Sequence, residues 1–221
     1  MKYLTSKEMA LVDKLVVEKY NVAILQMMEN AGSNFARFVS RLKPKHVIVF
    51  FGKGNNGGDG LAAARHLAIY GIKVTLIQAS KELNENATHQ LLTLNKMGIT
   101  PSKSFKAKKG DVIIDSLLGY NIKGNPREPI AELIRAINFS KSKGVKVVSF
   151  DLPSGLNPNT GKAYDPCVNA DYTLTLALPK TGLRKLNNLY LVNLGIPNEL
   201  YKELGININK LFEKGDVVKI K

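Results

Sequence analysis

Two stretches near the start of the chain place apolar residues at the 3.6-residue period of helices. A capping box formed by Thr5 and Glu8 precedes the first stretch, and Pro44 ends the second. The apolar positions are Met9, Val12, Leu15, Val16 and Tyr20 in the first stretch, and Ile24, Met28, Ala31, Phe35, Phe38, Val39 and Leu42 in the second. The pattern predicts two amphipathic helices ahead of the rest of the fold.

Beyond Pro44, short apolar runs alternate with helical segments. The runs predict strands at 46–51, 73–77, 112–114, 145–150, 174–177 and 189–192, and helices are expected at 61–70, 82–97 and 129–139. Alternation of this kind is typical of a parallel sheet with right-handed crossovers. The expected fold class is therefore α/β, a three-layer α/β/α Rossmann-like arrangement with a mostly parallel sheet and two extra N-terminal helices.

The 221 residues show no internal repeat and no linker rich in Gly or Ser. We expect a single domain over residues 1–221, with a core of about residues 1–205 and a short basic C-terminal tail. The tail beyond Asn209 is expected to be loosely held. Charged residues interrupt the N-terminal stretch and no apolar run approaches the roughly 20 residues of a membrane helix, which predicts a cytoplasmic protein without membrane contact.

Charge and cysteine content narrow the possible functions. Lys and Arg outnumber Asp and Glu by 32 to 18, which gives a net charge of +14. This excess is compatible with an anionic partner, but the basic residues occur in short groups without interleaved aromatic residues, which favours a solvated surface over a nucleic-acid site. The single cysteine, Cys167, points to a reducing compartment and is interpreted as inert. Three histidines make a multi-His zinc site improbable.

Candidate chemistry gathers where predicted strands end, because parallel sheets bind ligands beyond the carboxyl ends of their strands. The first strand runs into the segment 52–60, which is rich in Gly, Asn and Asp. Its glycines suit a tight turn close to a ligand, and the following helix start suits a phosphate. The pattern Gly52, Gly54 and Gly57 is a weak dinucleotide fingerprint, and the acidic residue expected after the next strand is missing, which disfavours an ordinary NAD dehydrogenase.

Two further strand ends carry carboxylates. Asp115 could bind a cation, exchange a proton or cap the next element. Asp151 stands at the start of Asp-Leu-Pro-Ser-Gly and could be a site residue or part of a structural turn. If their strands are neighbours, Asp59, Asp115 and Asp151 converge on one crevice, where crowded carboxylates raise one another's pKa or recruit a cation.

These motifs, taken in order, resemble the YjeF N-terminal domain over roughly residues 1–205. The resemblance rests on four motifs in register, supported by the sequence Met28-Glu-Asn-Ala-Gly32. The four are Asn55-Asn-Gly-Gly-Asp-Gly60 with Ala64-Arg-His-Leu67, Asp115-Ser-Leu-Leu-Gly119, Asp151-Leu-Pro-Ser-Gly155 and Pro179-Lys-Thr-Gly-Leu183. Enzymatic members of this family are NAD(P)HX epimerases, which interconvert the R and S forms of hydrated NADH and NADPH for repair by a separate dehydratase.

The resemblance implies a set of site residues. Substrate contacts are implied for Asn55, Asn56, Gly57, Gly58, Asp59, Asp151 and the phosphate loop made of Gly119, Tyr120, Asn121, Ile122, Lys123, Gly124 and Asn125. One potassium ion per subunit is implied, held by Asn56, Asp115 and Ser154, and similar proteins are homodimers. The family usually has Thr and Gly where this chain has Tyr120 and Asn121, whereas the usual Arg that closes the loop is present as Arg127.

Inversion at C6 of the hydrated ring needs a proton donor and an acceptor near one oxygen. We take Asp151 as the main acid/base and Asp59 as its assistant, because both follow strand ends beside the glycine-rich segment. Lys180 and Arg184 are interpreted as solvated surface, with contact to an anionic substrate as the alternative. Asn30 either points into the site or bonds to a neighbouring loop.

Two other classes of function remain open. The same fold occurs in the enhancer-of-decapping protein as a non-catalytic module for dimerisation and RNA metabolism, which the net charge of +14 would allow. A sensor regulated by potassium or a nucleotide is the third reading. The combination of Asn56, Asp115 and Ser154 favours the enzyme, since a scaffold has no need of these three together.

Overall fold

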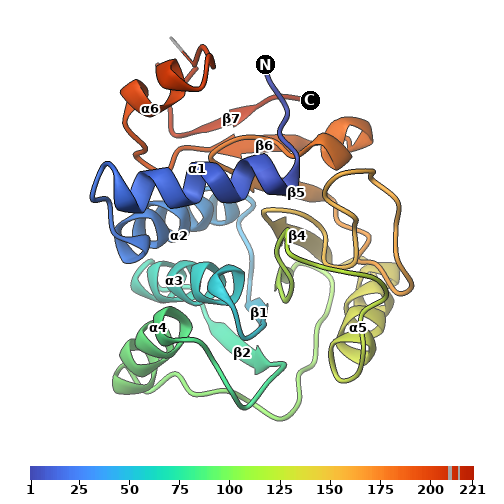
Figure 1. Ribbon diagram of the computed structural model, residues 1–221. Helices are drawn as coiled ribbons and strands as arrows, with labels where there is room; N and C mark the ends of the chain where they lie inside the picture. The colour runs from blue at the N-terminus through green and yellow to red at the C-terminus, as the bar shows by residue number, and fades with distance from the viewer. Residues whose placement is uncertain (209–210, 214) are drawn as a thin grey trace.

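The computed structural model describes residues 1–208, 211–213 and 215–221, and within them seven strands form one sheet in the order β2-β1-β3-β4-β5-β6-β7 (Figure 1). The strands are β1 (Val47–Phe51), β2 (Val74–Gln78), β3 (Val112–Ser116), β4 (Lys146–Phe150), β5 (Tyr172–Leu176), β6 (Leu189–Val192) and β7 (Val217–Lys219). The helices are α1 (Ser6–Glu18), α2 (Ile24–Arg41), α3 (Asn55–Ile69), α4 (Glu85–Lys96), α5 (Ile130–Ser142), α6 (Asn198–Glu203) and the 3₁₀ helix η1 (Thr181–Lys185).

All neighbouring strands pair in parallel except β7, which runs antiparallel to β6. The prediction of a loosely held tail is therefore wrong for residues 217–219, which the ladder to β6 fixes. The sequence signal was weak because the strand is short and its apolar side chains are only partly buried. Asn209, Lys210 and Lys214, also part of that prediction, lie outside the described residues.

Successive residues of β1 serve the two faces of the sheet, as the alternation of side chains along a strand requires. Val47, Val49 and Phe51 join the larger core with α1 to α4, whereas Ile48 and Phe50 join a smaller core with α5. Figure 1 shows α1 to α4 together on one side of the sheet and α5 on the other. The predicted three-layer α/β/α arrangement with two extra N-terminal helices is confirmed.

The start of α3 differs most from the sequence prediction. The helix begins at Asn55, so the segment expected to be a loop up to Gly60 forms its first turns. Its glycines are needed for packing within the protein. A Cβ on Gly57 would lie 2.0 Å from the carbonyl oxygen of Gly52, and one on Gly60 would lie 2.0 Å from Ser116 Oγ. Close packing thus overrides the poor helix propensity of this segment.

The segment before α1 crosses the molecule and bonds to both neighbours of Lys180. The amide of Leu4 donates to the Pro179 carbonyl at 2.9 Å, and the amide of Thr181 donates to the Leu4 carbonyl at 2.8 Å. Leu4 itself is buried. We call residues 3–5 the N-terminal strap.

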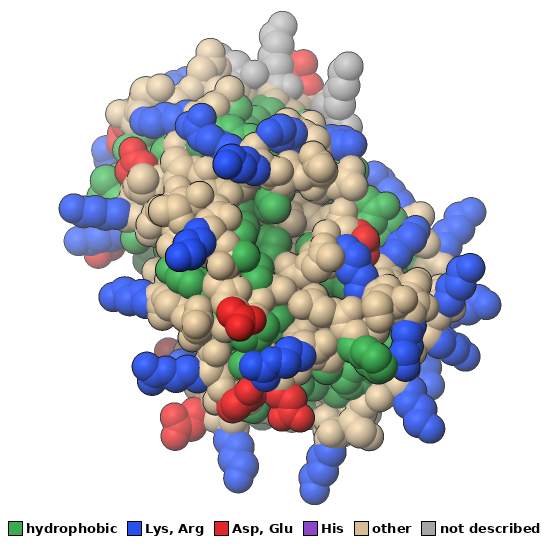
Figure 2. Space-filling model, turned by 90° about the vertical axis from the view of Figure 1, so that its right-hand side faces the viewer, with side chains coloured by type: hydrophobic (Ala, Val, Ile, Leu, Met, Phe, Trp, Pro, Cys, Tyr) green, Lys and Arg blue, Asp and Glu red, His purple; other side chains and the backbone are tan. Residues whose placement is uncertain are grey.

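Lys and Arg side chains are spread over the face shown in Figure 2, singly and in small groups, and do not form one continuous band. This view agrees with the prediction that much of the +14 charge is solvated surface. In the described part of the chain, none of the helices combines the length and apolar character needed to cross a bilayer.

Candidate active site

A cavity of about 950 Å³ lies at the carboxyl ends of the central strands, where the sequence placed the chemistry. Helices α1, α2 and α3 and the loops after β3, β4 and β5 form its walls. The polar residues that line it are Asp13, Lys14, Glu18, Lys53, Asn55, Asn56, Asp59, Ser80, Asn84, Tyr120, Asn121, Asp151 and Lys180. Neighbouring strands β1, β3 and β4 bring the three motifs to one edge of the sheet, where Asp59 and Asp151 line the cavity and Asp115 does not.

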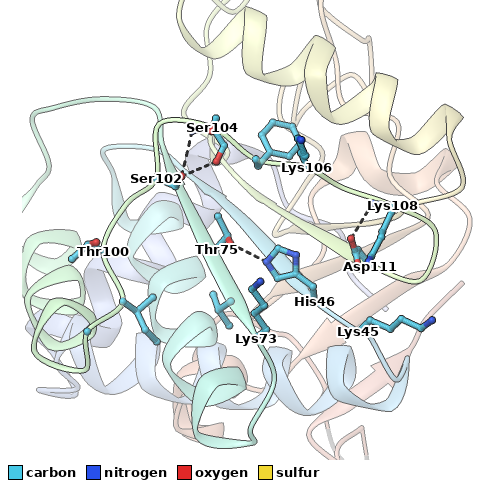
Figure 3. Close-up of a pocket in the computed structure, with 14 residues that line it drawn as sticks. Lys45, His46, Lys73, Thr75, Thr100, Ser102, Ser104, Lys106, Lys108 and Asp111 are labelled. Atoms are coloured by element: carbon cyan, nitrogen blue, oxygen red, sulfur yellow. Dashed lines mark hydrogen bonds between the residues drawn. The ribbon is translucent and has the colours of Figure 1, made fainter.

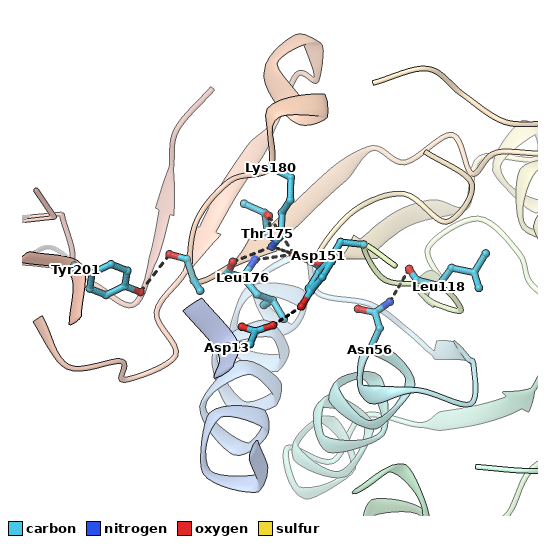
Figure 4. A network of polar contacts seen from close by, with 10 residues as sticks. Asp13, Asn56, Leu118, Asp151, Thr175, Leu176, Lys180 and Tyr201 are labelled. Atoms are coloured by element: carbon cyan, nitrogen blue, oxygen red, sulfur yellow. Dashed lines mark hydrogen bonds and ion pairs between the residues drawn. The ribbon is translucent and has the colours of Figure 1, made fainter. Parts of the chain in front are cut away.

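Asp151 directly follows β4 and is held by one of its two carboxylate oxygens. Its Oδ1 accepts bonds from Thr175 Oγ1 at 3.2 Å and from the Leu176 amide at 3.1 Å, and it forms an ion pair with Lys180 (Figure 4). The backbone has φ of +64°, in the left-handed region that non-glycine residues rarely adopt. None of the hydrogen bonds within the described chain uses Asp151 Oδ2, so this oxygen stays available to a ligand.

Lys180 is buried, with 1% of its surface exposed, so its interpretation as solvated surface is wrong. Besides the ion pair, its Nζ donates to the Leu176 carbonyl at 3.0 Å. A buried ammonium is tolerated only when it is paired and hydrogen-bonded, and Asp151 meets that requirement. Arg184, by contrast, is exposed and lies over the ring of Tyr3, as a surface residue would.

Asp59 projects from the first turns of α3 and is 8% exposed. No hydrogen bond to its carboxylate occurs among residues 1–208, 211–213 and 215–221. Burial raises its pKa well above the ordinary value, and the negative charges of Asp151 and Asp13 raise it further, against the opposing charge of Lys180. Asp59 therefore keeps its proton to a higher pH than an ordinary aspartate does.

Asp13 and Tyr120 meet across the mouth of the cavity. Tyr120, in the loop after β3, donates its phenol hydrogen to Asp13 Oδ2 on α1 at 2.5 Å. Burial raises the pKa of Asp13, and burial together with the charge of Asp13 raises the pKa of Tyr120. The phenol thus stays protonated and links the loop to α1.

Asp115 lies behind the cavity wall and is fully buried. Its carboxylate accepts four bonds, from Ser149 Oγ at 2.7 Å, Ser154 Oγ at 2.6 Å, the Ser154 amide at 2.9 Å and the Leu117 amide at 3.3 Å. Burial raises its pKa, and these bonds oppose the rise. Asp115 therefore ties the loops after β3 and β4 together; we call it and Ser154 the buried corner.

Asn56, in the first turn of α3, connects the buried corner to the cavity. Its Nδ2 donates to the Leu118 carbonyl at 3.0 Å, and Leu118 in turn donates its amide to Ser154 Oγ at 2.9 Å (Figure 4). Asn56 Oδ1 is buried without a hydrogen-bond partner among the described residues. An orphaned buried oxygen on a residue linked through Leu118 to Ser154 is a position that a cation would satisfy.

The remaining predicted contacts divide into two groups. Asn55 and residues 119–122 line the cavity, although Asn55 Oδ1 already accepts from Asn84 Nδ2 at 2.6 Å. Gly57, Gly58, Lys123, Gly124 and Asn125 are not among its lining residues. Asn125 Oδ1 instead accepts the Asp165 amide at 3.2 Å, which anchors the end of the loop.

Asn30 and Cys167 agree with an interpretation made from the sequence. Asn30 Nδ2 donates to the Leu194 carbonyl at 2.9 Å, so it bonds to a neighbouring loop. Burial raises the pKa of Cys167 to about 12, which agrees with an inert thiol.

Sequence reasoning missed Asp13 and Asn84 as cavity residues. Asp13 follows Met9 by four residues and therefore lies on the buried face of α1, where a carboxylate is out of place. A carboxylate on the apolar face of a predicted helix was therefore the signal in the sequence that could have identified Asp13. Asn84 reads as an ordinary cap for α4, a role that it also fills by accepting from the Ala87 amide at 2.9 Å.

The chain matches known proteins over most of its length. A family model described as YjeF-related protein N-terminus matches residues 24–182. The NAD(P)H-hydrate epimerase of Dehalogenimonas lykanthroporepellens is 36% identical over 220 residues, covering 95% of this chain and 89% of that protein. The NAD(P)H-hydrate epimerase of Cenarchaeum symbiosum is 40% identical over 189 residues, covering 80% of this chain and 87% of that protein.

Longer proteins match as well. The bifunctional NAD(P)H-hydrate repair enzyme Nnr of Methanopyrus kandleri is 38% identical over 77% of this chain, which spans only 37% of that protein. Among solved structures, the crystal structure of yeast ynu0, YNL200c, is similar with a TM-score of 0.88 at 25% identity, over 100% of both chains. Family model, relatives and fold agree, and the chain belongs to the family of YjeF-related protein N-termini.

Proposed function

We propose that this chain is an NAD(P)H-hydrate epimerase that interconverts the R and S forms of NADHX and NADPHX. Relatives that bear this name cover most of the chain. The observation that carries the proposal is the pair Asp59 and Asp151, which present free carboxylate oxygens to one large cavity. The volume of about 950 Å³ lies at the upper end of the range for small-molecule sites and suits a dinucleotide.

The two carboxylates divide the proton transfers between them. Asp59, with its raised pKa, donates a proton to the C6 hydroxyl as the C6–O bond breaks and water leaves, and the electron pair of the ring nitrogen stabilises the C6 cation. Asp151, whose charge Lys180 compensates, orients the ring and accepts a proton at Oδ2 from the water that adds to the other face of C6. One turnover therefore moves a proton from Asp59 to Asp151, and exchange with solvent restores both residues.

The start of α3 is the proposed phosphate subsite. Gly54, Asn55 and Asn56 line the cavity, so the free amides of the helix N-terminus face it. These amides and the helix dipole favour negative charge. Residues 119–122 form the facing side, held by the bond between Tyr120 and Asp13.

A potassium ion is proposed at the buried corner, with Asn56 Oδ1, Asp115 and Ser154 as protein ligands. The orphaned Asn56 oxygen and a donor set made of oxygen alone fit a hard cation. Within the described residues, no group of three or more His, Cys, Asp or Glu is arranged for a metal, and the proposed set has one carboxylate, which suits a monovalent ion. The ion would supply positive charge close to the phosphate subsite.

A coupled assay tests the activity. An S-specific dehydratase with ATP removes the S form of NADHX quickly, and the chain should make the R form disappear rapidly as well. Asp59→Asn should abolish that second phase while the protein stays folded. If Asp59→Asn and Asp151→Asn both turn over purified (R)-NADHX at the unmodified rate, the assignment is wrong. RNA binding at physiological salt without turnover would favour the non-catalytic module.

Three further properties belong to this proposal. We expect an NAD(P)HX dehydratase as a functional partner, because three longer relatives are named bifunctional NAD(P)H-hydrate repair enzymes. A homodimer is expected in solution, which light scattering after size exclusion would test. A cytoplasmic location is expected, which fractionation of cells would test.

A further inference from the structure

A second cavity, of about 690 Å³, lies at the opposite edge of the sheet from the candidate active site (Figure 3). Residues just before β1, β2 and β3 form one side of it, and the segment 98–108 after α4 forms the other. It therefore opens at the amino ends of the parallel strands. Ligand sites in open α/β sheets usually lie at the carboxyl ends, so the proposed epimerase activity gives this cavity no role.

Four lysines surround this cavity, namely Lys45, Lys73, Lys106 and Lys108. Each is exposed, and none of the ion pairs in the described chain uses any of their ammonium groups. Like charges around one cavity repel each other, and an anion in the cavity would relieve that repulsion. The only carboxylate of the wall is Asp111, which leaves the cavity strongly positive.

The basic wall is built on a fixed frame. Asp111 is buried, and its Oδ2 accepts the Lys108 amide at 2.9 Å while the Asp111 amide donates to the Lys108 carbonyl at 3.0 Å. The Lys45 amide donates to the Gly110 carbonyl at 3.0 Å. These bonds fix the backbone from which Lys45 and Lys108 project.

Apolar residues lie among the lysines of this cavity. Val74, Ile99 and Phe105 are half-buried and line it. Phe105 packs edge-on against Phe50 of β1, with ring centroids 4.9 Å apart, so its position is set by the core. Positive charge beside fixed apolar surface suits a ligand with an anionic group and a flat organic part.

We propose that this cavity binds a small phosphate ester with a flat, largely apolar portion, of the nucleoside monophosphate class. The lysines hold the phosphate, and Val74, Ile99 and Phe105 hold the base. Thr75 and Thr100 also line the cavity and add hydroxyl groups. The limited volume of about 690 Å³ favours a small ligand over a nucleic-acid strand, which needs a continuous groove.

His46 gives the proposal a local reporter, because it lines this cavity and bonds to Thr75 Oγ1 at 2.9 Å. Burial lowers its pKa; Lys73 and Lys108 lower it further, and Asp111 opposes them. A phosphate beside these lysines offsets their charge and should raise the His46 pKa. His66, paired with Glu29, and His89 lie elsewhere and serve as internal controls.

The experiment follows the imidazole signals of the intact protein by NMR over pH, with AMP, adenosine or inorganic phosphate added. AMP should raise the His46 pKa with saturation at submillimolar concentration, inorganic phosphate should do so only weakly, and adenosine should not. The imidazole signals of His66 and His89 should not respond to AMP. An unchanged His46 titration with saturating AMP, or a response to an RNA oligonucleotide but not to AMP, would overturn the proposal.

Matched lysine variants test the location of the site. The double variant Lys73→Gln/Lys106→Gln should weaken AMP binding at least tenfold. Lys103→Gln/Lys109→Gln removes the same charge from the same region, but neither residue lines the cavity, so binding should change less than twofold. Equal weakening by both pairs would mean that the effect is general electrostatics and no site exists. Epimerase turnover should be unchanged in both double variants, which separates this proposal from the active site.

Discussion

The buried corner and the cavity wall use the same side chain, aspartate, in opposite ways. In the corner, Asp115 accepts four bonds from Ser149, Ser154 and Leu117, which tie the loops after β3 and β4 together. On the wall, within the described residues, Asp151 has one oxygen without a hydrogen bond and Asp59 has two. A buried carboxylate held by several protein donors is fixed in place, whereas one with unbonded oxygens beside a cavity is available for chemistry.

Replacing Asp151 should have the largest combined effect, because it lowers both activity and stability. Asp151→Asn is expected to lower kcat by roughly 10²–10⁴-fold, the range for loss of a general acid or base. It also leaves Lys180 buried without its counter-charge, which should cost about 3–5 kcal/mol of unfolding free energy. The coupled assay and urea unfolding measure the two effects.

The double variant Asp151→Asn/Lys180→Met separates these effects, because it removes the unpaired charge as well. Stability should recover in large part and activity should not. Recovery of turnover in the double variant would show that Asp151 acts only by neutralising Lys180.

Replacing Asp115 should affect stability most. Asp115→Ala leaves the hydroxyls of Ser149 and Ser154 without their acceptor, and we expect a loss of about 3 kcal/mol in unfolding free energy. Ser149→Ala removes a single donor and should cost about 1 kcal/mol. Urea unfolding compares the two variants; equal losses would contradict the view that the carboxylate ties two loops together.

Asp59→Asn should stabilise the protein while abolishing turnover. The raised pKa of Asp59 means that the folded state favours its neutral form. That preference stabilises the fold below the ordinary aspartate pKa and is lost as pH rises through the raised value. The variant should therefore exceed the unmodified chain by on the order of 1 kcal/mol at pH 8, and by nothing at pH 3. A difference that stays constant over this range would be incompatible with a neutral Asp59.

Tyr120→Phe should have the smallest effect. It removes the bond to Asp13 but keeps the ring, so we expect a loss of about 1 kcal/mol in stability. Because the loop would then close less firmly on the substrate, KM should rise a few-fold with kcat nearly unchanged. Tyr164→Phe, which loses a bond to Asn157 outside the cavity, is the matched control and should leave KM in place.

Much of the fold could be predicted because its signals are local. The helical spacing before Pro44 and the apolar runs that followed identified α1, α2 and the first six strands. The order of motifs at strand ends placed Asp59, Asp115 and Asp151 together because parallel strands end at one edge. The start of α3 escaped prediction because Gly57 and Gly60 are selected by packing against Gly52 and Ser116, contacts that no local pattern reveals.

The environment of each site residue was harder to predict. Lys180 reads as a surface lysine because its burial depends on a partner 29 positions earlier and on the strap that bonds to the residues on either side of it. The opposite roles of Asp115 and Asp59 also depend on neighbours distant in sequence, since Ser149 and Ser154 donate to Asp115 and, in the described part of the chain, no donor bonds to Asp59. Sequence located the carboxylates, and only the three-dimensional contacts distinguished them.

The N-terminal strap connects the beginning of the chain to the ion pair between Lys180 and Asp151. Leu4 bonds to Pro179 and Thr181, the two neighbours of the ammonium that compensates Asp151. Removal of the first five residues, or a bulky fusion that pulls Leu4 from its place, would free that backbone and let water reach Lys180. The activity of tagged or trimmed protein would then depend on whether the N-terminal strap is in place, as well as on the residues of the cavity.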